Sequence, residues 1–271
     1  MSGLPIRTVE KPWGRDTLPE PFSAPAGKRI GEIWFEPPPQ LHSILVKYIF
    51  TSEALSVQVH PSDEQAAASG ETARTGYGGK EECWLVIAAE EGAALGVGFK
   101  KPIGAEAMRR AALDGTIEGL LTWYPVRPGD FFYIPAGTVH AIGGGVSLVE
   151  IQQNSDITYR LYDYGRGREL HLDAGIAVAR GEPHDPACRK HLPASGTVEL
   201  ARGRYFTAHR LEGEPDPAIR HEYAGKLLAI PLSGTVTGGE ETVGPGECLY
   251  ADGIDQLRFE SGGKTVLVRP A

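Results

Sequence analysis

The segment from Pro128 to Arg160 constrains the fold most, because short apolar strands alternate in it with Pro/Gly turns. Turns fall at Pro128-Gly129 and at Pro135-Ala136-Gly137, and the three glycines from Gly143 to Gly145 indicate a hairpin. Apolar strands that turn every eight to twelve residues or so are typical of a small β-barrel. His140 stands directly after the second turn. The sequence therefore predicts a barrel with a histidine near its mouth.

The strand that follows this hairpin has a period of two, so every second side chain shares one face. That face carries a carboxylate among apolar and amide side chains, in the order Val146, Leu148, Glu150 and Gln152. A carboxylate on the inner face of a barrel strand needs a partner, because burying a charge is costly. Barrel mouths are common places for ligands and metals. We therefore expect His140 and Glu150 to face a binding site.

Composition excludes several classes of protein. The 271 residues include 35 acidic and 27 basic residues, which gives a formal net charge of −8 and argues against binding to nucleic acid. No apolar run is long enough for a membrane span, and the N-terminus shows no signal peptide. The three cysteines are too few and too scattered for a disulfide framework or a thiolate zinc cluster. These features predict a cytoplasmic protein without nucleic-acid or membrane partners.

The chain contains an internal echo that suggests two similar β units. Val126–Tyr133 resembles Val243–Tyr250, and in that register His140 falls opposite Leu257. The second unit thus has the turn and strand without the histidine. We predict three regions in sequence order, which are a catalytic domain with a short helical insert at 104–122, a linker, and a degenerate β domain, at residues 1–180, 181–196 and 197–271.

Two further strands place polar side chains on one face. Ser56, Gln58 and His60 alternate along one strand, and Lys80 and Glu82 along another. Each pattern taken alone also fits a solvent-facing strand or a surface ion pair. Together with His140, however, the set of two imidazoles, a carboxylate and an amide oxygen suits Zn²⁺, with Mn²⁺, Fe²⁺ or Co²⁺ as competitors. The absence of a thiolate favours a site with open positions, as in catalytic metal centres.

Six motifs follow one another at sensible spacing over roughly residues 9 to 180. They are Lys11-Pro-Trp-Gly14, Gly31-Glu-Ile-Trp34, Leu55-Ser-Val-Gln-Val-His-Pro61, Lys80-Glu-Glu-Cys-Trp84, Pro135-Ala-Gly-Thr-Val-His-Ala141 and Ile157-Thr-Tyr-Arg-Leu-Tyr-Asp163. In these motifs the chain resembles the type I mannose-6-phosphate isomerases of the cupin superfamily, in their compact bacterial form. The resemblance implies an all-β fold of two cupin (jelly-roll) barrels with a few short helices, the second barrel being degenerate.

The same resemblance implies an activity and a set of site residues. The activity is the zinc-dependent interconversion of mannose 6-phosphate and fructose 6-phosphate through a cis-enediol. One Zn²⁺ per chain is expected, in a monomer or homodimer whose partner is a small sugar phosphate. The implied residues are the metal ligands Gln58, His60, Glu82 (rather than Glu81) and His140, the catalytic residues Arg160, Glu150 and Lys80, and the substrate-binding residues Ser56, Trp13 and Glu32.

Several alternatives stay open at this point. Glu150 is the first candidate for the base that moves the proton, and Lys80 is the second, since a lysine beside a metal can have a depressed pKa. Glu150 could instead only position Arg160 through an ion pair. The alternative functions are a non-catalytic sugar-phosphate-binding cupin, a cupin isomerase for another sugar phosphate, and an Fe²⁺ oxygenase. The convergence of a lysine and an arginine disfavours the oxygenase.

Overall fold

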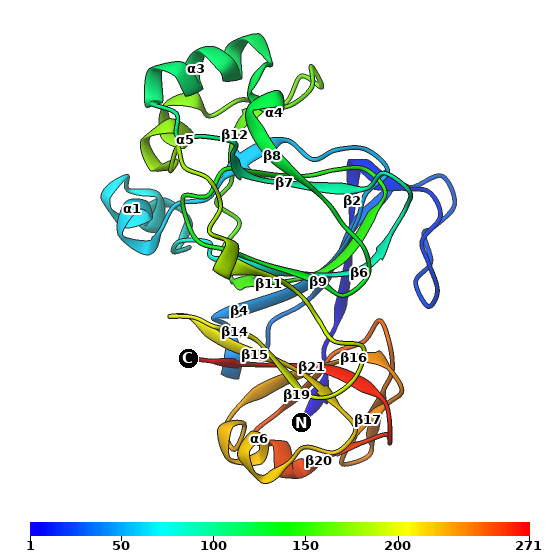
Figure 1. Cartoon of the computed structure of the whole chain (residues 1–271). Coiled ribbons are helices and arrows are strands. Elements are labelled where there is room, and N and C mark those ends of the chain that lie inside the picture. Colours follow the sequence, from blue (N-terminus) through cyan, green and yellow to red (C-terminus); the bar gives the residue numbers. More distant parts are fainter.

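The computed structural model describes all of residues 1–271 and is a stack of four β-sheets, with most of the helices toward the upper end and one helix at the lower end (Figure 1). From the helical end downward in the view, the sheets have five, seven, six and three strands. The first two sheets form the N-terminal β domain, and the last two form the C-terminal one. The prediction of an all-β fold of two β units with a few short helices is confirmed.

The N-terminal domain is built from two facing sheets whose strands are antiparallel neighbours. The seven-stranded sheet contains, in spatial order, β13 (Arg189–His191), β9 (Asp130–Ile134), β6 (Glu82–Ala89), β11 (Val146–Gln153), β4 (Ile44–Phe50), β3 (Ile30–Phe35) and β2 (Ile6–Arg15). The five-stranded sheet contains β12 (Tyr159–Tyr162), β5 (Val57–Val59), β10 (His140–Ile142), β7 (Ala94–Phe99) and β8 (Leu121–Pro125).

The C-terminal domain repeats this sandwich arrangement on a smaller scale. Its six-stranded sheet contains β1 (Ser2–Gly3), β19 (Leu249–Ala251), β16 (Leu227–Ser233), β21 (Lys264–Pro270), β15 (Phe206–Glu212) and β14 (Val198–Arg202). Its three-stranded sheet contains β18 (Glu241–Val243), β17 (Val236–Gly238) and β20 (Leu257–Phe259). The first residues of the chain therefore complete a sheet of the last domain, and the N-terminus lies among the C-terminal strands in Figure 1.

Helices are few and short. They are α1 (Asp63–Ala68), α2 (Glu71–Thr75), α3 (Ala105–Asp114), α4 (Ile117–Leu120), α5 (Leu172–Val178) and α6 (Pro217–Glu222), with 3₁₀ turns η1 (Pro39–Leu41), η2 (Pro186–Cys188) and η3 (Ile254–Gln256). Helix α3 buries Met108, Ala111 and Ala112 against the outer face of the five-stranded sheet. Gly115 lies in the left-handed region, at φ +81°, and ends α3 before α4 begins.

The largest apolar cluster lies between the two domains. Its 26 buried residues come mainly from the outer face of the seven-stranded sheet and the facing side of the six-stranded sheet, with a few from connecting segments. Strand β4 shows why, since Val46, Tyr48 and Phe50 face this interface while Lys47 and Ile49 face the interior of the first domain. Such a strand is buried on both sides, which matches its nearly continuous apolar sequence. The two domains therefore share a core and form one packed unit.

One part of the predicted linker at 181–196 is instead a strand. Residues 189–191 form β13, which pairs with β9 at the edge of the seven-stranded sheet. The sequence Arg-Lys-His has no apolar alternation, because an exposed edge strand of three residues buries no face. Its pairing depends on the neighbouring strand and could not be read from the segment itself.

The internal echo corresponds to two turns of the same geometry. Gly129 and Gly246 both lie in the left-handed region, at φ +91° and +90°. In each turn a carboxylate accepts a backbone hydrogen bond at 2.8 Å, from Arg127 N to Asp130 Oδ2 and from Gly244 N to Glu247 Oε2. Glu247 follows Gly246 just as Asp130 follows Gly129. The two units therefore share the geometry of this turn as well as the sandwich arrangement of their sheets.

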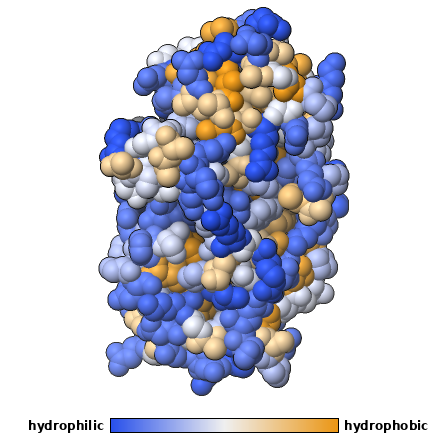
Figure 2. All heavy atoms as spheres, turned by 90° about the vertical axis from the view of Figure 1, so that its left-hand side faces the viewer, coloured by the Kyte–Doolittle hydropathy of each residue, from blue (hydrophilic) through white to orange (hydrophobic).

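The face that carries α1, α3 and α5 is shown in space-filling form in Figure 2. Polar residues cover most of it, and apolar residues gather mainly at its upper, helical end. Leu113 and Leu170, which lie in or next to these helices, are among the exposed large apolar residues. No helix has the length and apolar character that a membrane span requires.

We expect Gly246→Ala to lower the free energy of unfolding by about 1–2 kcal/mol, because a left-handed backbone is unfavourable for any residue with a Cβ. The added Cβ would also lie 3.0 Å from Pro21 Cγ. Gly244→Ala is the matched control, because its Cβ meets nothing within 4 Å. Urea unfolding of both variants measures the difference. Equal stability of the two would contradict the role given to the turn.

Candidate metal centre and active-site cavity

Three side chains with metal-ligand chemistry converge in the interior of the N-terminal domain. His60 follows β5, Glu82 begins β6 and His140 begins β10. All three are buried, and their ligand atoms lie within 4.8 Å of one another. Two of these strands belong to the five-stranded sheet and one to the seven-stranded sheet, so the site lies between the two sheets. It is the only group of three or more His, Cys, Asp or Glu residues so arranged.

Backbone carbonyls orient both imidazoles. His60 Nδ1 lies 2.9 Å from Ile157 O, and His140 Nδ1 lies 2.9 Å from Thr138 O. A carbonyl only accepts, so each Nδ1 carries the proton and each Nε2 presents a lone pair. The two Nε2 atoms lie 3.6 and 3.5 Å from the Glu82 carboxylate. A hydrogen bond from the ring nitrogen that does not bind the metal is the usual way of orienting a histidine ligand.

Burial keeps both histidines neutral. Burial lowers the pKa of His140, and it lowers that of His60 further with the help of the nearby Lys80 charge. A pKa below the ordinary value near 6.5 means that both rings are unprotonated at pH 7. Neutral imidazole is the form that binds a metal. The two histidines are therefore ready to act as ligands.

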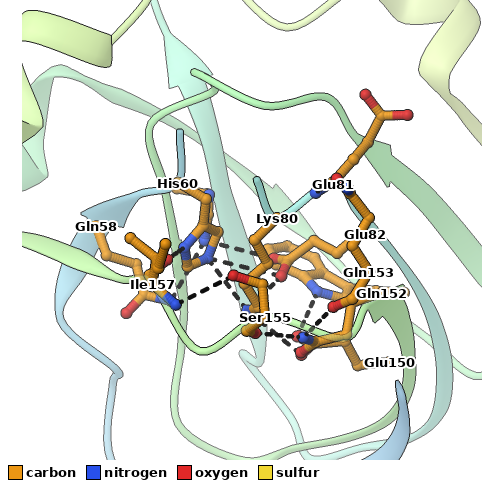
Figure 3. Close-up of polar contacts among 12 residues, drawn as sticks. Gln58, His60, Lys80, Glu81, Glu82, Glu150, Gln152, Gln153, Ser155 and Ile157 are labelled. Atoms are coloured by element: carbon orange, nitrogen blue, oxygen red, sulfur yellow. Dashed lines mark hydrogen bonds and ion pairs between the residues drawn. The ribbon is translucent and has the colours of Figure 1, made fainter. Parts of the chain in front are cut away.

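The Glu82 carboxylate is fully buried and neither of its oxygens accepts a hydrogen bond. Its closest cation is Lys80, whose Nζ lies 2.6 Å from Oε2 without hydrogen-bond geometry (Figure 3). Burial alone would raise the pKa of Glu82, but the neighbouring Lys80 charge outweighs it and lowers the pKa. A charged carboxylate with unused acceptors, facing two imidazole lone pairs, fits a divalent transition metal such as Zn²⁺.

Gln58 lies beside this group with its amide in a defined orientation. Its Nε2 is 3.3 Å from His140 Nε2, and its Oε1 accepts a hydrogen bond of 3.1 Å from Ser56 Oγ. A half-turn of the amide would exchange the two atoms and direct Oε1 toward the three ligands. Gln58 is thus within reach as a fourth ligand. Glu81, in contrast, points away and contacts the Tyr133 hydroxyl (Figure 3).

A chain of alternating charges extends from the metal group along the inner face of the sheet. Lys80 Nζ lies 3.6 Å from Glu150 Oε1, and Lys47 Nζ lies 2.8 Å from the same oxygen. Lys47 is also 4.0 Å from Glu32. The chain ends at Lys11, which is 3.1 Å from Glu32. Four of these five residues are buried, so each charge relies on its neighbours for compensation.

Two tryptophans and the lysine charges fix the carboxylates in this chain. Trp84 Nε1 donates to Glu150 Oε2 at 2.9 Å, and Trp34 Nε1 donates to Glu32 Oε2 at 2.5 Å. Burial alone would lower the pKa of Lys47, but Glu150 and Glu32 outweigh it and raise the pKa. Lys47 is therefore charged, and Glu150 is paired with it.

The sequence alone did not identify Lys47 and Trp84 as the residues that hold Glu150. The signal for Lys47 was present, because it is the only charge in the apolar run Ile44–Phe50. Its partner could not be read from the sequence, since Lys47 faces Glu150 through the register of β4 against β11. The predicted alternative in which Glu150 pairs with Arg160 is wrong, because no ion pair joins these two residues within 4 Å.

A cavity of about 430 Å³ opens beside the charge chain. Its walls include every predicted catalytic and substrate-binding residue, which are Trp13, Glu32, Ser56, Lys80, Glu150 and Arg160. Trp13 is also part of the apolar core between the two sheets, and Ser56 is buried beside Gln58. Further cavity residues that sequence analysis did not identify are Lys11, Arg74, Arg168 and His171.

Arg160 supplies the free cation of this cavity. Its Nε donates to the Glu169 carbonyl at 3.1 Å, and no carboxylate lies within 4 Å of the guanidinium. Arg168 differs, because both of its nitrogens that face Asp163 are held by that carboxylate. An unpaired, half-buried guanidinium beside a cavity suits an anionic ligand.

Known proteins with similar sequences carry one name, mannose-6-phosphate isomerase. No protein-family model matches the chain. The mannose-6-phosphate isomerase of Streptococcus mutans is 38% identical over 210 residues, which cover 74% of this chain and 63% of that protein. A probable mannose-6-phosphate isomerase of Bacillus subtilis is 33% identical over 226 residues, which cover 78% of this chain and 70% of that protein. The alignment with the Streptococcus protein thus spans just under two thirds of its length.

Solved structures with the same fold cover nearly the whole chain. The mannose 6-phosphate isomerase from Bacillus subtilis has a TM-score of 0.77 at 23% identity and covers 98% of both chains. A zinc-bound mannose 6-phosphate isomerase has a TM-score of 0.73 at 14% identity and covers 99% of this chain and 98% of that one. At such identities the likeness establishes the fold.

We expect the purified protein to hold about one Zn²⁺ per chain and to lose it in His60→Ala and His140→Ala, since each removes one of few ligands. Metal content after dialysis, measured by mass spectrometry, tests this. His42→Ala is the control, because His42 is exposed and lies outside the site. Unchanged zinc in both site variants would show that the metal binds elsewhere.

Proposed function

Because the chain belongs to the mannose-6-phosphate isomerase family, we propose that it interconverts mannose 6-phosphate and fructose 6-phosphate. The observation that carries the proposal is the convergence of two oriented imidazoles with a carboxylate that no hydrogen bond satisfies, directly beside Lys80 and Glu150. Aldose–ketose isomerisation moves a proton between two neighbouring carbons. It needs a base for that proton and a way to stabilise the developing oxyanion.

We assign the metal site to His60, Glu82, His140 and, after a half-turn of its amide, Gln58. The donor set contains no thiolate and has room for substrate, as catalytic zinc sites do. A zinc ion bound there supplies Lewis-acid polarisation of the substrate oxygens. The zinc-bound neighbour of the same fold supports zinc over the other divalent metals. The proposal is one ion per chain.

Glu150 is our candidate for the residue that moves the proton. Lys47 and the Trp84 indole hold its carboxylate in one orientation, so little reorganisation is needed for proton transfer. Lys80 remains the second candidate, because its Nζ lies between Glu82 and Glu150. A lysine so placed can also donate a proton or a hydrogen bond to a substrate oxygen.

Arg160 and Ser56 are proposed to contact the substrate itself. The free terminal nitrogens of Arg160 can bind the phosphate or the enediolate, since a guanidinium forms paired hydrogen bonds with oxyanions. Ser56 lies on the cavity wall, and its hydroxyl donates a hydrogen bond to Gln58 Oε1. Glu32 and Trp13 complete the wall, Glu32 mainly by holding Lys11 and Lys47.

The chemistry is proposed to belong to the first domain alone. Every residue that lines the cavity falls between Lys11 and His171, inside the predicted catalytic region 1–180. The C-terminal region 197–271 supplies packing through the shared apolar core. A small sugar phosphate is the proposed partner, and the choice between a monomer and a homodimer stays a prediction.

We expect the protein to convert mannose 6-phosphate to fructose 6-phosphate and to lose this activity when a chelator removes its metal. Re-addition of Zn²⁺ should restore it, because the ligand set is formed by the folded chain. A coupled assay over several hexose 6-phosphates measures the substrate range. Binding of mannose 6-phosphate without turnover would favour the non-catalytic alternative, and full activity after chelation would exclude a catalytic metal.

Glu150→Gln should reduce kcat about 10²–10⁴-fold while zinc content is retained, because the amide cannot accept the proton. Glu81→Gln is the matched control, since Glu81 directly precedes β6, the neighbour of β11, but points away from the site. Circular dichroism must show a folded protein, because the change leaves Lys47 without its closest carboxylate. If kcat stays near normal while Lys80→Met abolishes turnover, then Lys80 is the base.

A further inference from the structure

A second cavity, of about 550 Å³, lies between the two domains and is separate from the metal centre. Tyr48 and Leu85 line it from the first domain, and Leu232 lines it from the second. The two repeated turns, at Pro128-Gly129 and Pro245-Gly246, both contribute to its walls. A cavity of this size, with largely apolar walls, is in the range of small-molecule sites. None of its lining residues lines the active-site cavity.

The cavity contains a buried arginine without an anionic partner. Arg210 on β15 is only 5% exposed, and no carboxylate lies within 4 Å of its guanidinium. Its terminal nitrogens donate to the carbonyls of Pro193 and Gly196 at 2.7 and 2.8 Å, and its Nε is buried without a partner. Carbonyl dipoles satisfy hydrogen bonds but leave the net charge uncompensated. Burying such a charge is costly.

A second cation lies on the same face of the sheet. Lys264 begins β21, which pairs with β15, and its Nζ donates to Ala194 O at 2.7 Å without an ion pair. The other charged residues that line the cavity are Glu20 and His191. Glu20 is exposed, and His191 is paired with Asp130 at 2.8 Å. Glu212, the cross-strand neighbour of Lys264, accepts a hydrogen bond from Gly196 N and forms no ion pair with either cation. Arg210 and Lys264 therefore face the cavity without an ion-pair partner.

We propose that this cavity binds a small organic anion with an apolar body, whose carboxylate or phosphate group faces Arg210 and Lys264. The charged group would offset the uncompensated cations, and the apolar body would cover the walls formed by Tyr48, Leu85 and Leu232. Tyr48 and Leu85 follow Lys47 and Trp84, whose side chains face the metal centre from the other side of the same sheet. Such a ligand therefore binds behind the active site and does not compete with substrate.

Calorimetric titration of the intact protein with benzoate and with phenyl phosphate tests this proposal, and benzamide serves as the neutral counterpart. We expect at least one anion to bind at one site per chain with a Kd below about 1 mM. The preferred head group then tells a carboxylate ligand from a phosphate ester. Benzamide should bind at least tenfold more weakly, because it lacks the charge.

Variants locate the binding event. Arg210→Gln and Lys264→Gln should each weaken it at least tenfold, whereas Lys226→Gln, which removes an exposed cation in the same domain, should not. Lys264→Gln carries the test if the Arg210 variant does not fold. Binding should persist in Arg160→Gln, which separates this site from the active-site cation. Absence of binding by both anions, equal binding of benzamide, or loss of binding in Arg160→Gln would each overturn the proposal.

Discussion

The alternating buried charges from Lys11 to Glu82 are the interaction on which the site depends. Lys80 and Lys47 both contact Glu150, and each also lies within ion-pair distance of a further carboxylate. Removing one member of a buried ion pair typically costs about 3–5 kcal/mol, because its partner is left uncompensated. This row of alternating charges thus links the candidate metal ligands to the candidate base, Glu150. Its members hold one another in fixed positions, which is the preorganisation that proton transfer requires.

This unit can be buried because the central seven-stranded sheet is covered on both sides. One face of β4 packs in the core between the domains, and its other face presents Lys47 to the cavity. The C-terminal domain supplies no residue to the candidate site but covers the back of the seven-stranded sheet and excludes water from it. A low local dielectric strengthens each ion pair on the inner face. The proposed anion site lies between the same two sheets, in a cavity whose walls include the two repeated turns.

The two domains show that scaffold and chemistry are separate properties of this fold. Both contain the Pro-Gly turn, in which the glycine is left-handed and the next residue's carboxylate accepts a backbone hydrogen bond. The second strand after the turn begins with His140 in the first domain and with Leu257 in the second, where Leu257 is buried in an apolar core. The second sandwich has no group of metal-binding side chains. Apolar side chains fill the interior of the second sandwich, whereas polar and charged side chains line the interior of the first.

The sequence by itself determined most of the strands and turns and which side chains share a strand face, because strand parity and turn chemistry are local. For this reason Gln58, His60, Glu82 and His140 could be proposed as one group. Only the tertiary structure decided that Lys47 holds Glu150, that residues 189–191 complete a sheet, and that Arg210 lies buried between the domains. These features depend on strand register and on how two sheets pack. They arise from contacts between residues far apart in the chain, which no local pattern encodes.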